Sequence, residues 1–211
     1  MKHKFPGAPR LAHLGARIRR LREERGMRLV DVSRHAGYTK GFLSKIENGH
    51  ASPPIATLMK IAQALQIDPG EFFRKGTDDG AAADPDATVQ VRPHERRAVE
   101  NAEAGPGYSY WALAAPRVHK FMQPFLLTVR PREVDPAKRF EHPGEEFIFV
   151  LSGKMDYRVG DEVFSLQAGD SLYFDASRPH APLPKRKPVT FLALFYAPPV
   201  RLKRTRTRTR R

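Results

Sequence analysis

Residues 29–65 read LVDVSRHAGYTKGFLSKIENGHASPPIATLMKIAQAL, and this stretch decides the fold of the N-terminal part of the chain. Its apolar residues recur at helical spacings, so that each short helix can turn one face toward a shared core. The positions that set this pattern are Val32, Ala36, Leu43 and Ile46. The pattern predicts two short helices joined by a tight turn, followed by a third helix that packs across them.

Residues that end and begin helices lie between these segments. Gly37 ends the first helix, because glycine adopts the left-handed conformation at little cost. Thr39 is a natural N-cap for the second helix, since its hydroxyl can accept from a free backbone N–H. Gly49 ends that helix, and Pro53-Pro54 opens the third. A helix, a short turn with glycine and a second helix form a helix-turn-helix motif.

The spacing of these residues resembles the Xre-type (lambda-repressor-like) helix-turn-helix family over about residues 14–73. The positions that match the family signature are Val32, Ser33, Gly37, Thr39, Leu43, Ser44, Ile46, Glu47, Gly49, Pro53 and Leu58. The resemblance implies an all-α bundle that reads double-stranded DNA through the second helix of the pair. Arg28 stands where the family usually has a capping Ser or Thr. This change either costs about 1 kcal/mol of capping energy or places a guanidinium on a phosphate.

The resemblance and the side-chain chemistry together give the expected DNA contacts. They are Arg19, Arg28, Thr39, Lys40, Gly41, Phe42, Ser44, Lys45 and Asn48. Lysine can donate to guanine O6 and N7, and a residue as small as Gly41 lets the backbone approach the groove closely. Phe42 either meets a thymine methyl group or packs within the domain. Glu47 is acidic and would be repelled by DNA, and the family resemblance implies a structural role at this position, a tie between helices rather than a reader of bases.

A helix rich in arginine is expected before this motif. Residues 11–25, LAHLGARIRRLREER, are amphipathic, with an apolar stripe and five arginines on the remaining surface. In this motif the first helix crosses the DNA backbone, so we expect at least one of these arginines to contact phosphate. A short closing helix begins at Asp68. The helical domain is therefore placed at residues 11–74, and a flexible, acidic linker at residues 75–87.

The positive charge of the chain is concentrated at its two ends, and the formal net charge is +14. Residues 1–75 hold 15 Lys and Arg against 6 Asp and Glu, residues 76–200 hold 15 against 17, and residues 201–211 hold 7 against none. Charge placed on the helix-turn-helix rather than spread evenly indicates a polyanion as partner. The basic tail at 201–211 is expected to be disordered; it either binds phosphates nonspecifically or has no function.

The pattern changes after Thr88, where short segments rich in β-branched and aromatic residues alternate with turn formers. We expect strands at Thr88–Arg92, Tyr108–Leu113, Phe125–Val129, Glu146–Leu151, Asp156–Val159, Val163–Leu166, Ser171–Phe174 and Thr190–Tyr196. Many short strands with regular turns are typical of an antiparallel sandwich or barrel.

Residues in this half resemble the paired motifs of the cupins. The matching positions are His142, Glu146 and Gly153 for the first motif and Gly169 and His180 for the second, where Asp175 and Ser177 replace the usual Pro and Gly. The resemblance implies a double-stranded β-helix barrel that senses a ligand, over residues 88–200. The predicted fold class is a two-domain chain, with an all-α helix-turn-helix bundle followed by an all-β cupin barrel.

The cupin resemblance implies that a metal, if bound, would be held by three histidines and a glutamate. Phe140 stands at the first of the histidine positions in this chain. His142, Glu146 and His180 remain, which is the ligand set of a facial triad. Positions 140, 142 and 146 differ by even numbers and could share one face of a strand, although Pro143-Gly144 interrupts them. We favour a barrel without a cofactor, with a divalent metal on the three remaining residues as the alternative.

A barrel of this size can hold one small ligand even without a metal. The residues expected to line the pocket are Phe140, His142, Glu146, Tyr157 and His180. Phe140 would form an apolar wall, and the two histidines are the groups that respond to pH near neutrality. No residue identifies the ligand.

Composition excludes several classes of protein. The chain has no cysteine, which excludes thiol chemistry, disulfides and cysteine-bound zinc. It contains no apolar run near the roughly 18 residues that span a bilayer, and its N-terminal residues lack the apolar core of a secretory signal. We therefore expect a soluble, cytoplasmic protein without membrane contact.

These features favour a transcription regulator that binds DNA as a homodimer, with two recognition helices about one helical turn apart on a palindromic operator. A small-molecule effector would bind in the barrel and alter the spacing or order of the two heads. The first alternative is an enzyme, in which a metal-dependent cupin oxygenase or isomerase is fused to a DNA-binding head. The second alternative is a nonspecific coat on nucleic acid, driven by the basic tail.

Overall fold

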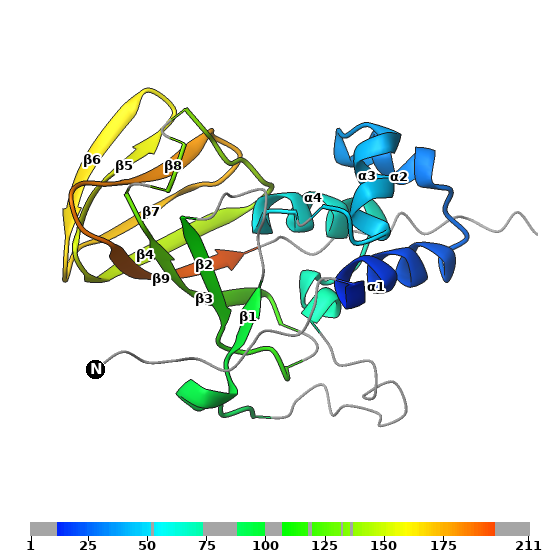
Figure 1. The fold of residues 1–211 in the computed structure, drawn as a ribbon, viewed down its shortest axis with the longest axis horizontal. Coiled ribbons are helices and arrows are strands. Elements are labelled where there is room, and N and C mark those ends of the chain that lie inside the picture. Colours follow the sequence, from blue (N-terminus) through cyan, green and yellow to red (C-terminus); the bar gives the residue numbers. More distant parts are fainter. Residues whose placement is uncertain are drawn as a thin grey trace, which may run out of the picture.

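The computed structural model describes residues 12–51, 53–73, 88–99, 107–117, 120–131, 133–135 and 137–196. It shows a group of helices beside a two-sheet barrel (Figure 1). The expected linker at 75–87, the basic tail at 201–211 and the last residues of the expected cupin domain, 197–200, lie outside the described residues.

The helical half has the order expected from its sequence. Its elements are α1 (Ala12–Glu23), α2 (Leu29–Ala36), α3 (Lys40–Glu47), α4 (Ile55–Leu65) and the short 3-10 helix η1 (Pro69–Phe73). Gly37 ends α2 with a φ of 75°, and the Thr39 hydroxyl accepts from the Phe42 N–H at 3.2 Å. Both boundary signals are therefore confirmed. Arg28 makes no side-chain capping bond at the start of α2.

The helical core is formed by one face of each helix. The buried apolar residues include Ile18, Leu21, Val32, Ala36, Leu43, Ile46, Leu58, Ile61 and Leu65. Helices α1 and α3 approach closely at Gly15, where an added Cβ would lie 2.2 Å from the Ile46 carbonyl oxygen. Only glycine fits there, so this contact sets how the first helix crosses the third. Among the described helices, none combines the length and the apolar character needed to cross a bilayer.

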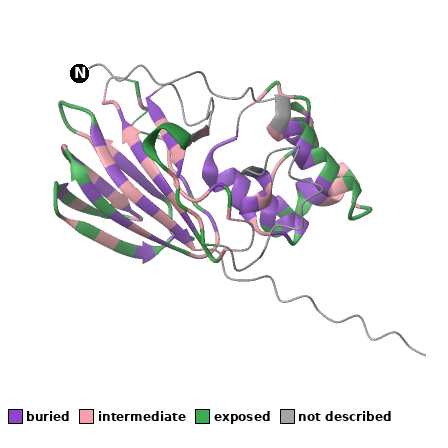
Figure 2. Ribbon diagram, turned by 90° about the horizontal axis from the view of Figure 1, so that it is seen from below, coloured by how far each residue is buried: buried purple, intermediate pink, exposed green. Residues whose placement is uncertain are grey.

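The C-terminal half contains two antiparallel sheets, as the predicted fold class requires. Its elements are η2 (Pro93–Glu95), β1 (Arg97–Val99), β2 (Tyr108–Ala112), β3 (Met122–Val129), β4 (Glu145–Ser152), β5 (Lys154–Val159), β6 (Glu162–Gln167), β7 (Ser171–Asp175), β8 (His180–Pro184) and β9 (Val189–Tyr196). The six-stranded sheet has the order β1-β2-β3-β9-β4-β7, and the three-stranded sheet has the order β6-β5-β8. Buried side chains alternate with more exposed ones along several strands, so the core lies between the sheets (Figure 2).

Three strand predictions need correction, and the first is that β1 was not expected. The strand expected at Thr88–Arg92 is wrong, because these residues form no regular structure and the chain enters η2 instead. Strand β8 was also not expected; it contains Pro182 and Pro184, which cannot donate to a ladder. In the structure β8 is the last strand of its sheet, with a ladder to β5 and a single bridge from His180 to Phe140 on its other side, and an edge strand tolerates proline.

Candidate functional site

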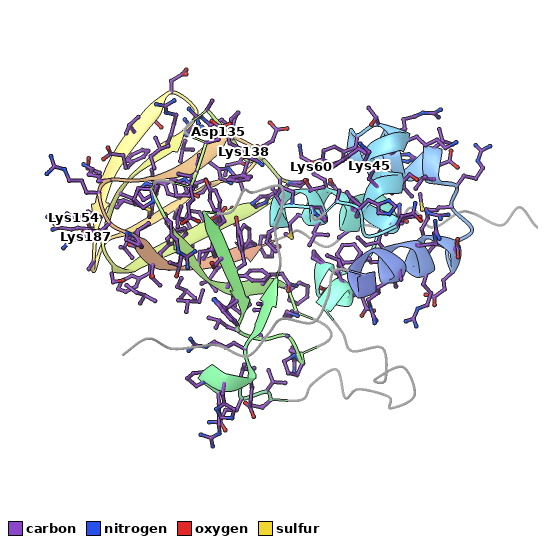
Figure 3. All side chains as sticks on the ribbon, viewed as in Figure 1. Lys45, Lys60, Asp135, Lys138, Lys154 and Lys187 are labelled. Atoms are coloured by element: carbon purple, nitrogen blue, oxygen red, sulfur yellow. The ribbon has the colours of Figure 1, made fainter. Side chains whose placement is uncertain are left out.

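The exposed face of α3 is the candidate DNA-reading surface, and we call Lys40, Gly41, Ser44 and Lys45 the reading surface from here on. Both lysines and Gly41 are exposed, and a Cβ added at Gly41 would meet no atom within 4 Å. Figure 3 places Lys45 on the helical half, at the opposite side of the molecule from Lys154 and Lys187 of the barrel. An uncrowded, cationic helix face can approach the major groove and donate to guanine acceptors.

Residues from α1 meet the end of α3 beside this surface. The Arg19 Nη2 donates to Asn48 Oδ1 at 3.1 Å, and Asn48 Nδ2 donates to the Ser44 carbonyl oxygen at 2.8 Å. Arg19 and Asn48 remain exposed. The structure thus brings three of the expected contact residues, Arg19, Ser44 and Asn48, into one cluster.

Glu47 ties α1 to α3, which confirms the structural role expected for it. Arg22 Nε donates to Glu47 Oε1 at 2.7 Å and Arg22 Nη2 donates to Oε2 at 2.9 Å, a bidentate pair. The hydrogen bond from Glu47 raises the pKa of Arg22 although partial burial opposes it. Arg17 is also turned inward, toward the Glu71 carbonyl. The exposed arginines in this part of the chain are Arg19 and Arg20 of α1 and Arg25 in the turn that follows it.

Three other expected DNA contacts are engaged within the protein. The Phe42 ring is half-buried with its centroid 5.1 Å from that of Tyr38, which favours the packing interpretation over a thymine contact. Arg28 Nε donates to Asp31 Oδ2 at 2.8 Å, and this hydrogen bond raises the pKa of Arg28. Arg28 would therefore have to leave Asp31 to reach a phosphate. The Thr39 hydroxyl is occupied by its capping bond.

All five residues expected in the barrel pocket line one cavity, and each is at most 9% exposed. Glu146 comes from β4, Tyr157 from β5 and His180 from β8. Phe140 and His180 exchange two backbone hydrogen bonds of 2.8 Å. Positions 140, 142 and 146 do not lie on one strand, because the chain turns at Gly144 (φ 100°) in the Pro-Gly pair noted in the sequence, before β4 begins.

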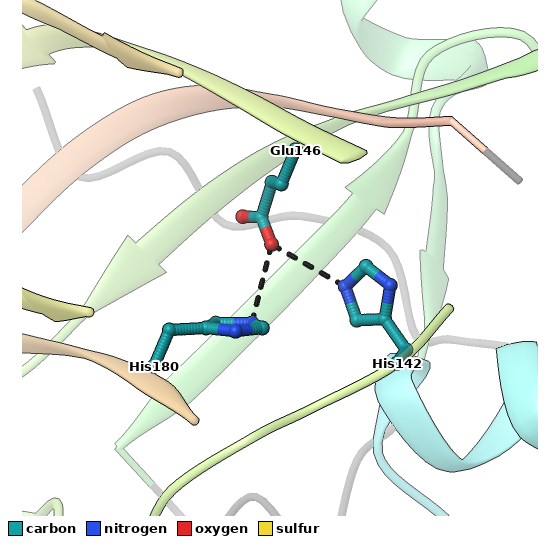
Figure 4. A group of neighbouring side chains, drawn as sticks. All are labelled: His142, Glu146 and His180. Carbon is teal, nitrogen blue, oxygen red and sulfur yellow. Dashed lines mark hydrogen bonds and ion pairs between the residues drawn. The ribbon is translucent and has the colours of Figure 1, made fainter. Parts of the chain in front are cut away.

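Glu146 lies between the two histidines (Figure 4). Its Oε2 is 3.4 Å from His142 Nε2 and 3.3 Å from His180 Nε2. The Nδ1 atoms face backbone carbonyls, those of Pro143 at 3.3 Å and Arg178 at 2.8 Å. A neutral imidazole that donates from Nδ1 has only a lone pair on Nε2. Three acceptors therefore face one another unless a proton or a cation lies among them.

The charges of this cluster follow from the hydrogen bonds and charges of its members, which outweigh burial. Burial raises the pKa of Glu146, but hydrogen bonds from both histidines outweigh it and lower that pKa to about 2. Burial lowers the pKa of His180, and the hydrogen bond and charge of Glu146 outweigh this and raise it. Burial and the charge of Glu146 raise the pKa of Tyr157, whose neutral hydroxyl donates to Glu146 Oε1 at 3.4 Å. The pocket thus contains a buried carboxylate that stays ionised.

His142, Glu146 and His180 also fit a divalent metal. Their candidate ligand atoms lie within 4.8 Å of one another. The two nitrogen–oxygen separations are close to the edge of about 3.4 Å in a tetrahedron built on ordinary zinc–nitrogen and zinc–oxygen bonds. The Nδ1 contacts to carbonyls are those that orient a ligating imidazole. Phe140 presents an apolar ring where a further ligand would stand.

Other residues of the pocket wall were not identified from the sequence. The barrel contributes Tyr110, Leu127, Pro182, Phe191 and Phe195, and the first turn of α4 contributes Ile55 and Ala56. Strand alternation could have found most of the barrel residues, since they share the inward face with Glu146. No sequence signal indicates the two α4 residues. The cavity that remains is about 20 Å³, enough for one water or ion.

Two protein families match the chain. The helix-turn-helix family matches residues 18–72, and the cupin domain family matches residues 125–195. These ranges contain the reading surface and the five residues expected from the sequence to line the barrel pocket, and both predicted resemblances are confirmed.

Several transcriptional regulators align with most of the chain. The HTH-type transcriptional regulator PuuR of Escherichia coli (strain K12) is 24% identical over 172 residues, 79% of this chain and 85% of that protein. The HTH-type transcriptional regulator SutR of the same strain is 25% identical over 167 residues, 79% of this chain and 84% of that protein. An HTH_3 family transcriptional regulator from Vibrio cholerae has a similar fold, with a TM-score of 0.63 and 22% identity over 89% of this chain and 97% of that one. The chain therefore belongs to the Xre-type helix-turn-helix transcriptional regulators that carry a C-terminal cupin domain.

Proposed function

We propose that the protein binds a palindromic operator through the reading surface and that a small molecule in the barrel pocket controls this binding. The observation that carries the first part is that α3 presents two exposed lysines and an uncrowded glycine on the half of the chain where Lys and Arg outnumber Asp and Glu by 15 to 6. The pocket supports the second part, because it is buried, is lined mainly by aliphatic and aromatic side chains and contains an ionised carboxylate. A regulator that reads chromosomal DNA works in the cytoplasm.

We infer that the protein acts as a homodimer. Leu126, Leu192 and Phe149 lie opposite one another on the outer face of β3, β9 and β4. Tyr173 of the neighbouring β7 is 62% exposed. Antiparallel sheets usually present polar residues to water, so this apolar outer face favours contact with a second copy of the chain. A two-fold axis would also place two reading surfaces as a palindrome requires.

The dimer is tested by measuring molar mass with light scattering. Phe149→Glu should halve the molar mass, because a charge would be buried at the contact. Val163→Glu, at an exposed position on β6 of the other sheet, is the matched control and should leave the mass unchanged. A monomeric wild-type protein would contradict the homodimer.

We propose a binding role for the pocket rather than a catalytic one. The second candidate function is a metal-dependent enzyme, and the three buried potential ligands favour it. Metal analysis of the purified protein separates the two. Stoichiometric iron, manganese or zinc whose removal leaves operator binding intact would support the enzyme, whereas a metal-free preparation with full operator affinity would support the sensor.

The decisive experiment is selection of bound duplexes from a random DNA library. Wild-type protein should recover a palindromic motif, and the Lys40→Ala/Lys45→Ala variant should lose it. The Lys154→Ala/Lys187→Ala variant removes the same charge from exposed barrel positions and should recover the wild-type motif. Binding without a motif, equal in all three proteins, would reduce the function to nonspecific contact with phosphates.

A further inference from the structure

The wall of the barrel pocket is built by both halves of the protein. Ile55 and Ala56, the first two residues of α4, line the cavity together with Phe140 and His142. They are only 2% and 7% exposed. Figure 4 shows the helix beside His142. A ligand that enters the barrel therefore meets the DNA-binding half directly.

Polar contacts hold the α4 region against the barrel on both sides of this wall. Lys60 Nζ lies 2.6 Å from Glu141 Oε1, at the junction of the two halves (Figure 3). Beyond the end of α4, the Asp68 carboxylate accepts from the Lys120 N–H at 3.0 Å and from Gln123 Nε2 at 2.9 Å. These contacts dock the helical half on the barrel in one orientation.

Helix α4 is also linked to the reading surface. The Tyr38 hydroxyl lies 3.0 Å from Thr57 Oγ1, one residue after Ala56. The Tyr38 ring packs in turn against Phe42 of α3. A line of contacting side chains thus runs from the pocket wall to the recognition helix. Coupling also requires an element with two positions, because continuity alone carries no energy.

The size of the cavity identifies that element. A cavity of about 20 Å³ holds one water or ion, so a larger ligand must push a wall outward. The strands are held by ladders of backbone hydrogen bonds, for example along β3 and β9. The first turn of α4 is held against the barrel by packing and a few polar contacts. This turn is therefore the wall that yields.

We propose that α4 is the movable wall of the effector pocket. A ligand larger than a single water or ion displaces Ile55 and Ala56, separates Lys60 from Glu141 and loosens the helical half from the barrel. The inference rests on the proposed function of this pocket. In the docked state the reading surface is exposed and its orientation is fixed, which lowers the ordering cost of binding a palindrome. Effector and operator then weaken each other's binding, as linkage requires.

A larger side chain that fills the pocket permanently tests this proposal in the full chain. Leu127 of β3 lines the cavity, and Leu127→Trp would fill it from the barrel side. Val163→Trp, at an exposed position on β6 that lies outside both the pocket lining and the proposed dimer face, is the matched control. Hydrogen exchange should become at least about tenfold faster in the first turn of α4, where the Leu58 N–H donates to the Pro54 carbonyl at 3.0 Å. Exchange in β4 and β9 should stay unchanged, and operator affinity should fall about fivefold or more.

Lys60→Gln provides a second variant that touches no pocket atom, and it decides the question if Leu127→Trp does not fold. It should accelerate exchange in the same turn by a smaller factor. Unchanged α4 exchange in the folded variants overturns the movable wall, and faster exchange with unchanged operator affinity overturns its coupling to DNA. A wild-type protein that selects no DNA motif overturns the proposed function instead, while the exchange measurement still tests the wall.

Discussion

Replacing Glu47 by alanine should destabilise the helical half and leave the barrel intact. The Glu47 side chain is 1% exposed and accepts two hydrogen bonds from Arg22, whose side chain is 12% exposed. Breaking a fully buried pair costs about 3–5 kcal/mol. Arg22 keeps some contact with solvent and its 2.9 Å bond to the Met27 carbonyl, so we expect a smaller cost, about 2–3 kcal/mol. For a domain of this size that corresponds to a fall in melting temperature of about 10–20 °C.

Calorimetry of the full chain is the appropriate assay, because a two-domain protein need not melt in one transition. Glu24→Ala removes an ion pair with Arg20 in which both side chains are about half exposed, and it should cost less than about 1 kcal/mol. A fall of less than about 4 °C for Glu47→Ala would refute the buried tie. An equal fall in both transitions would mean that the two halves melt as one unit.

Three further predictions concern the pocket and the turn before α3. Cobalt titration, followed by visible absorbance, should show one binding site per chain. His180→Ala should abolish this site, and His94→Ala, at an exposed position, should leave it intact. Cobalt binding that survives His180→Ala would contradict the metal fit. In chelator-treated protein the melting temperature of the barrel should be highest between about pH 4.5 and 6.5. Ionised Glu146 stabilises the barrel fully above its ordinary pKa of 4.5, and this stabilisation is lost as the pH falls toward its lowered pKa of about 2. Protonated His180 stabilises the barrel fully below its ordinary pKa of 6.5, and this stabilisation is lost as the pH rises through its raised pKa. Melting curves of Glu146→Gln should lose this maximum. Gly37→Ala should lower the free energy of unfolding by about 1–2 kcal/mol, because Gly37 has a φ of 75°. Gly41→Ala, inside α3 with open space around it, should raise that free energy by about 0.5–1 kcal/mol. Equal effects of the two substitutions in thermal unfolding would refute the conformational argument.

The helical half could be predicted in detail because its signals act over a few residues. Gly37 and Thr39 end one helix and begin the next through contacts within four residues of themselves. Such contacts depend on local sequence alone. The tie between Glu47 and Arg22 spans 25 residues and was expected only because the family resemblance implies it.

The barrel could be predicted as a class, but its edges and its pocket depend on distant pairing. Proline argues against a strand unless the strand lies at an edge, and edge positions are known only from the assembled sheet, as in β8. The pocket residues do converge, although by a different route from the one expected. His142 and Glu146 do not share a strand face, and Phe140 is placed by its backbone bridge to His180.

The contribution of α4 to the pocket could not be predicted, for a physical reason that bears on function. Ile55 belongs to a helix that is buried over a broad face, so the core of the helical half fully accounts for its apolar character. Periodicity reports that a residue is buried, and it does not report how many surfaces bury it. The cluster of His142, Glu146 and His180 belongs to the barrel alone, whereas the wall that closes it belongs to the DNA-binding half. A separated barrel would keep the three polar residues and lose that wall, so the closed pocket exists only where both domains are joined in one chain.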